Sequence, residues 1–97
     1  MVNNMRISKA QLAALAQIKT ISYDWVNREL VESEVTARDS VFVREDGTLV
    51  LSGEDGRGFA DYYCEFGVDI HPELVEWAES MGCYWEWENP GCAVLAN

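Results

Sequence analysis

The spacing of apolar residues predicts a helix near the N-terminus. Apolar side chains recur there at intervals of three and four residues, as on one face of an α-helix: Leu12, Leu15, Ala16 and Ile18. Ser8 followed three residues later by Gln11 has the form of a capping box, in which each residue binds the other's backbone N–H. We therefore expect a helix from about residue 9 to residue 19.

The next segment, residues 20–35, fits two patterns. Ile21, Tyr23 and Trp25 alternate as in a strand, whereas Trp25, Val26, Glu29 and Leu30 also fit the spacing of a helix. Because residues 27–29 (Asn-Arg-Glu) are poor strand formers, we favour a helix over about residues 23–32, and the strand remains the alternative.

Residues 40–52 alternate in a way that predicts a β-hairpin. A three-residue loop, Glu45-Asp46-Gly47, with Gly47 in the left-handed conformation, gives the hairpin one wholly aliphatic face. The pairs facing each other in this register are Val43 with Leu49 and Val41 with Leu51.

Two further helices are expected in the following segment. Residues 59–66 place aromatic residues at helical spacing and end at Gly67. Pro72 suits the first turn of a second helix, and Gly82 suits its end. In this second helix, Leu74, Trp77, Ala78 and Met81 form an apolar stripe, which leaves Glu73, Glu76 and Glu79 facing water.

A second hairpin is expected over residues 83–96, around Asn89-Pro90-Gly91. Alternation directs Cys83, Trp85 and Trp87 to the core and Tyr84, Glu86 and Glu88 to the opposite face. In the expected register Trp87 faces Cys92 and Cys83 faces Ala96, so these two cysteines remain free thiols. The chain therefore predicts one α+β domain, residues 1–97, with a mainly antiparallel sheet built from two hairpins (about 40–52 and 83–96) and three to four short helices.

The distribution of charged residues adds an expectation about the surface of this domain. The net charge is −10, and residues 58–97 contain no Lys or Arg. They carry eight carboxylates: Asp61, Glu65, Asp69, Glu73, Glu76, Glu79, Glu86 and Glu88. Direct binding to nucleic acid or to an anionic membrane needs a basic footprint, so both are excluded as expected partners. A basic protein surface is the expected complement.

Candidate catalytic and metal-binding chemistry is weak. His71 stands just before Pro72, where it is expected to cap a helix, and no nucleophile motif surrounds Cys64, Cys83 or Cys92. Neither a zinc spacing nor an EF-hand loop is present. We expect no enzyme activity, no cofactor and no metal. The odd number of cysteines and the lack of a signal-peptide pattern favour a soluble cytoplasmic protein.

In size, charge and lack of catalytic residues the whole chain resembles the phage-encoded anti-CRISPR and anti-restriction inhibitors. The resemblance implies a non-enzymatic inhibitor that can act as a nucleic-acid mimic, in the host cytoplasm, on a nucleic-acid-handling complex such as a CRISPR effector. The expected binding residues are the eight carboxylates with two aromatic residues, Tyr62 and Tyr84. The alternative is a small adaptor or homodimeric module that interacts through exposed aromatic surface.

Overall fold

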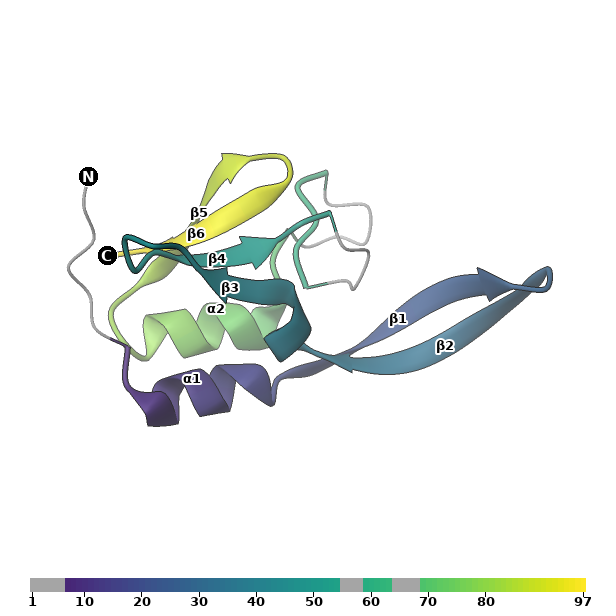
Figure 1. The fold of residues 1–97 in the computed structure, drawn as a ribbon, viewed down its shortest axis with the longest axis horizontal. Coiled ribbons are helices and arrows are strands. Elements are labelled where there is room, and N and C mark those ends of the chain that lie inside the picture. The colour runs from purple at the N-terminus through teal and green to yellow at the C-terminus, as the bar shows by residue number, and fades with distance from the viewer. Residues whose placement is uncertain (1–6, 55–58, 64–68) are drawn as a thin grey trace.

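The computed structural model describes residues 7–54, 59–63 and 69–97 (Figure 1). Two α-helices, a short 3₁₀ helix and six strands follow one another along this part of the chain. They are α1 (Lys9–Ala16), β1 (Lys19–Val26), β2 (Glu29–Thr36), η1 (Ala37–Ser40), β3 (Val41–Val43), β4 (Leu49–Ser52), α2 (Pro72–Glu79), β5 (Tyr84–Asn89) and β6 (Cys92–Ala96).

The main sheet has four antiparallel strands in the order β3-β4-β6-β5, with α1 and α2 packed on one side of it (Figure 1). We call this sheet with its helices the body. Its strands come from the two expected hairpins, so the α+β prediction is confirmed. The described residues contain two α-helices and η1, which is fewer α-helices than the three to four expected.

The first hairpin of the body has the register that its side-chain faces predict. Val41 pairs with Leu51 and Val43 pairs with Leu49. Gly47 has a φ of 87°, and its N–H donates to the carbonyl of Arg44 at 2.9 Å. A residue with a Cβ is strained at this φ, so the glycine specifies the three-residue loop.

The second hairpin forms, but its expected register is wrong by one residue. Trp87 faces Ala93 instead of Cys92, and Tyr84 instead of Cys83 faces Ala96. A bulge between Trp87 and Asn89 adds a residue to β5 near the turn. The two thiols are not joined, as expected, since neither Cys83 nor Cys92 forms a disulfide.

The core lies between the helices and one face of the sheet. Side chains that share this face by register include Leu51, Ala93, Leu49 and Leu95, and all four are buried. Indole N–H groups connect the layers: Trp77 donates to the carbonyl of Gln11 in α1 at 2.8 Å, and Trp85 donates to the carbonyl of Leu74 in α2 at 3.0 Å. Trp77 thus joins α2 to α1, and Trp85 joins α2 to the sheet.

The expected starts of α1 and α2 are confirmed, whereas α2 ends at Glu79, before the expected Gly82. Ser8 and Gln11 form the capping box, although α1 ends at Ala16, before the expected residue 19. The Nδ1 atom of His71 accepts from the Glu73 N–H at 3.2 Å, so this histidine caps α2. Gly82 follows the helix with a φ of 71°.

The helix expected over residues 59–66 is wrong where the structure describes the chain. Ala60 instead forms a β-bridge with Ile70, and the His71 N–H donates to the carbonyl of Phe59 at 2.8 Å. Phe59 is buried in the core, which favours the extended backbone that places it there. The remainder of this expectation, residues 64–66, lies outside the described residues.

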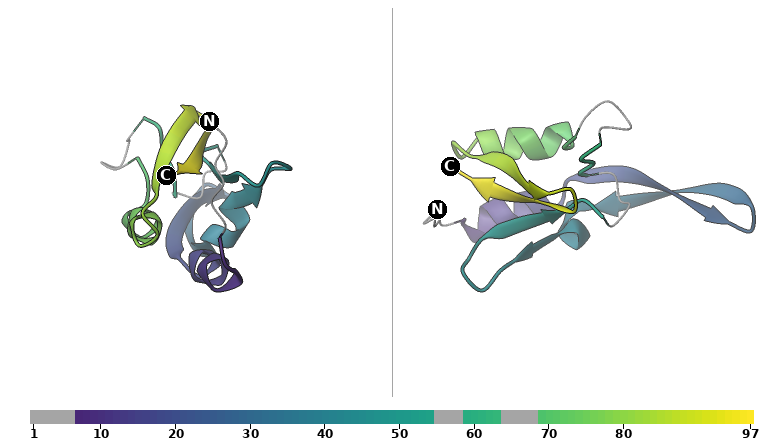
Figure 2. Two further views of the ribbon diagram at one scale, coloured as in Figure 1. Left: turned by 90° about the vertical axis from the view of Figure 1, so that its left-hand side faces the viewer. Right: turned by 90° about the horizontal axis from the view of Figure 1, so that it is seen from above.

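The helix favoured over residues 23–32 is also wrong. Strands β1 and β2 pair along their full length as a separate two-stranded sheet, from Lys19 opposite Thr36 to Val26 opposite Glu29. This hairpin, which we call the arm, projects from the body and gives the molecule a long axis of 47 Å against 27 and 25 Å (Figures 1 and 2). The residues that disfavoured a strand lie at or beside its turn.

Candidate functional site

The arm exposes an apolar surface that sequence reasoning missed. Residues directly opposite each other in an antiparallel pair share a face, so the register places Ile21, Tyr23, Trp25 and Leu30 together. We call these four residues the aromatic face. Trp25 is 74% exposed and Tyr23 is 50% exposed. The alternation of Ile21, Tyr23 and Trp25 was the sequence signal for this face.

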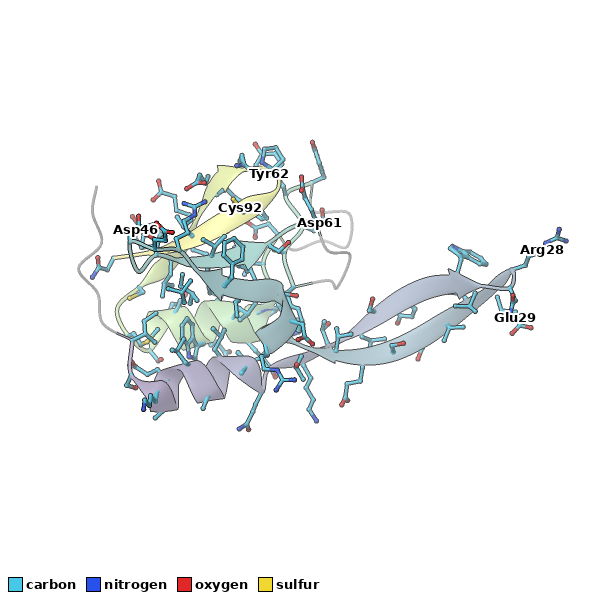
Figure 3. The ribbon with its side chains drawn as sticks, viewed as in Figure 1. Arg28, Glu29, Asp46, Asp61, Tyr62 and Cys92 are labelled. Atoms are coloured by element: carbon cyan, nitrogen blue, oxygen red, sulfur yellow. The ribbon has the colours of Figure 1, made fainter. Side chains whose placement is uncertain are left out.

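The turn of the arm fixes its register with two residues. Asn27 and Arg28 have φ values of 50° and 67°. Positive φ at both central residues is the signature of a type I′ turn, whose twist matches that of the flanking strands. Arg28 and Glu29 therefore lie at the tip, away from the body (Figure 3).

The predicted carboxylates of α2 form an outward row. Glu73, Glu76 and Glu79 are exposed, whereas Leu74, Trp77 and Ala78 on the other side of the helix are buried. We call the three glutamates the α2 row. At 1.5 Å per residue, successive members rise by about 4.5 Å. None of them takes part in a salt bridge found among the described residues.

A second group of predicted residues lies on the face of the sheet that points away from the helices. Tyr84, Glu86 and Glu88 alternate along β5 with the core-facing tryptophans, and all three are exposed. They line a hollow of about 540 Å³ together with Arg44 and residues from the end of β6. This group and the α2 row thus lie on opposite sides of the sheet.

Glu88 differs from its neighbours because it is paired. Both of its carboxylate oxygens accept from the Arg44 guanidinium, at 2.6 and 2.8 Å. These hydrogen bonds lower the pKa of Glu88 below its ordinary value of 4.5 and raise the pKa of Arg44. Arg44 follows β3 and Glu88 lies in β5, and these are the two edge strands, so the pair connects the two edges of the sheet.

Two of the predicted aspartates accept hydrogen bonds from neighbouring groups of the chain. Asp69 accepts from the indole N–H of Trp87 at 3.0 Å and from the N–H of Ile70 at 3.0 Å. Asp61 accepts from the N–H of Tyr63 at 3.1 Å. These bonds assign Asp61 and Asp69 local structural roles.

The predicted tyrosines have different surroundings. Tyr62 packs edge-on against Trp87, with 5.4 Å between ring centroids, and is 45% exposed. Tyr84 lies beside both groups of acids, because it also lines a smaller hollow of about 230 Å³ with Asp69 and Glu79. Glu65 lies outside the described residues.

The remaining candidate groups add little chemistry. Burial raises the pKa of the Cys83 thiol, and the Cys92 thiol donates to Glu88 at 3.7 Å. Within residues 7–54, 59–63 and 69–97, no cluster of three His, Cys, Asp or Glu side chains is arranged to hold a metal ion. Neither described helix has the length and apolar character needed to cross a membrane. Cys64 lies outside these ranges.

Comparison of the chain with protein-family models, curated proteins and solved structures finds no match. The site must therefore be interpreted from its own chemistry. It consists of an outward row of carboxylates on α2, a partly neutralised acidic group on β5, and an apolar face on the arm.

Proposed function

We propose that this chain is a non-enzymatic acidic inhibitor that binds a basic surface of a nucleic-acid-handling defence complex, such as a CRISPR effector, and blocks it. The α2 row carries the proposal. Its three carboxylates are exposed, ordered on one helix and without a salt bridge among the described residues. Such a row attracts lysine and arginine side chains and repels phosphates.

The body supports this role by holding the charges in place. Leu74 and Trp77 pack α2 into the core, so the backbone positions that carry its glutamates are fixed before binding. Preformed charge costs little ordering entropy on binding and speeds encounter with an oppositely charged surface. Binding of this kind weakens as salt screens the charges.

The test is affinity capture from a bacterial lysate with the full chain attached through its C-terminus, washed first at low salt and then at high salt. We expect nucleic-acid-binding proteins to be retained at low salt and released at high salt. A triple variant, Glu73→Lys, Glu76→Lys and Glu79→Lys, should lose them while keeping the circular dichroism of the wild type.

A matched variant controls for total charge. Glu29, Glu45 and Glu54 are also exposed and lie outside α2 and β5, so changing all three to lysine alters the net charge equally. This control should retain more of the captured proteins than the α2 variant. If the folded α2 variant binds them with unchanged affinity, the proposal is wrong.

A second function, a protein-interaction module working through exposed aromatic side chains, is favoured by the arm. Its exposed Trp25 and Tyr23 are of the types that dominate binding energy in protein interfaces. Association through this surface should hold or strengthen at high salt, whereas association through the α2 row should weaken. The salt washes therefore separate the two functions.

A further inference from the structure

The aromatic face has little cover within its own sheet. Beyond its base, where the Ala37 N–H donates to the carbonyl of Ile18 at 2.9 Å, the arm extends away from the body (Figure 2). An isolated two-stranded hairpin is marginally stable in water and cannot bury its own side chains. Covering Tyr23 and Trp25 would thus remove a large apolar surface from water.

This face is divided along its length into two rows. β1 contributes Ile21, Tyr23 and Trp25. β2 places Leu30 opposite Trp25 near the tip, and then Glu32 opposite Tyr23 and Glu34 opposite Ile21. Lys19 partly neutralises Glu34 at the base, at 3.2 Å. The apolar row of β1 therefore runs beside Glu32 and Glu34, which we call the carboxylate row, and a matching surface needs both an apolar and a cationic part.

A second copy of the chain does not match this division. If two arms pack face to face along their full length about a twofold axis across the strands, each row meets itself, so Glu32 and Glu34 face carboxylates of the other copy. If the twofold axis runs along the strands, Glu32 and Glu34 of each copy instead lie over the apolar row of the other copy. Both arrangements are unfavourable, and the net charge of −10 adds repulsion between copies.

We propose that the aromatic face of the arm binds a protein whose surface has an apolar groove bordered by lysine or arginine side chains. Tyr23 and Trp25 occupy the groove, and Glu32 and Glu34 pair with the cations along its border. The arm is suited to this because its paired strands hold the four apolar side chains in one register before binding. The proposal concerns a surface separate from the α2 row and does not rest on it.

The probe is a random peptide library displayed on phage, selected against the full chain. Attachment through Asn97 leaves the arm accessible, because the C-terminus lies at the opposite end of the molecule (Figure 1). We expect selected peptides to combine aromatic or aliphatic residues with lysine or arginine. Selection of apolar peptides without basic residues, or of no peptide, would overturn the proposal.

Variants locate the binding surface. Trp25→Ser should weaken binding of a selected synthetic peptide by about tenfold or more, because an exposed tryptophan is a typical binding hot spot. Phe42→Ala removes a 54% exposed aromatic side chain from the body and should leave the affinity unchanged. Equal losses in the two variants, or no loss in either, would contradict the assignment to the arm.

A charge reversal tests the second row while the apolar residues remain. A double variant, Glu32→Lys and Glu34→Lys, should select peptides bearing aspartate or glutamate in place of lysine or arginine. If the variant selects peptides with the same charge as the wild type does, the carboxylate row takes no part in binding. Sedimentation velocity of the wild type should give a monomer, and a dimer that Trp25→Ser dissociates would identify a second copy as the occupant and overturn the proposal.

Discussion

In the body, tryptophan side chains pack between two layers, whereas in the arm Trp25 points into solvent. Trp77 is 9% exposed and donates a hydrogen bond to α1, but Trp25 is 74% exposed on a sheet of two strands. Both residues are tryptophans, but helices cover the sheet of the body, whereas the arm extends away from them. A sheet buries an apolar face only when another layer covers it. The aromatic residues of the body therefore stabilise the fold, and those of the arm are available for binding.

The largest expected effect on stability comes from a test that replaces one residue in each region. Leu74→Ala, in the fully buried part of α2, should lower the free energy of unfolding by about 2–5 kcal/mol. Trp25→Ser should change it by no more than about 0.5 kcal/mol, because the side chain is mostly in water already. Urea denaturation followed by circular dichroism measures both. A large loss in Trp25→Ser would mean that the arm contributes to the core.

A smaller test concerns the turn of the arm alone. Arg28 has a φ of 67°, which is strained for any residue with a Cβ, and Asn-Gly is the preferred sequence for a type I′ turn. Arg28→Gly should stabilise the hairpin by about 1 kcal/mol, so hydrogen exchange of the arm amides should slow by about fivefold. Exchange in β4 and β6 should stay the same. Faster exchange in the arm would contradict the assigned turn.

The smallest effect is expected at the ion pair of the body. The pKa of Glu88 is lowered by its hydrogen bonds to Arg44, so the pair stabilises the fold above pH 4.5 and this contribution is lost as the pH falls through the lowered pKa. Glu88→Gln should slightly lower the thermal midpoint at pH 7, and the two midpoints should converge in acid. Salt reduces the difference because the pair is exposed. A difference that grows on acidification would contradict this assignment.

The sequence predicted the elements that have strong local signals. Gly47 determined the loop of the first hairpin, and the aliphatic alternation around it determined the register. The apolar stripe of α2 predicted which of its glutamates face water. In each case one local preference and one burial pattern agree, which is the condition for a reliable prediction.

The arm was not predicted because its turn lacks the usual glycine. Asn27-Arg28 adopts the conformation that Asn-Gly favours, and the helical spacing of Trp25 and Leu30 competed with the strand pattern. The register of the second hairpin was wrong for a different reason, since a bulge after Trp87 adds a residue to β5 that side-chain alternation does not predict.

The candidate site was predicted only in part. The exposure of the α2 row followed from helical periodicity, but the pairing of Arg44 with Glu88 depends on a strand order that brings together residues far apart in the sequence. The bond between Asp69 and Trp87 likewise arises from tertiary structure. Charge counts therefore identified acidic residues without separating those that face solvent from those that hold the fold.

The most direct test of the account is the association rate of a captured basic partner with the wild type and with the α2 variant, in which Glu73, Glu76 and Glu79 are lysines, measured over a range of salt concentrations. We expect the wild type to associate rapidly at low salt and more slowly as salt rises, and the variant to lose most of this dependence. The control variant, in which Glu29, Glu45 and Glu54 are lysines, should keep more of the salt dependence. Equal rates and equal salt dependence in the wild type and the folded α2 variant would contradict the claim that the α2 row forms the binding surface.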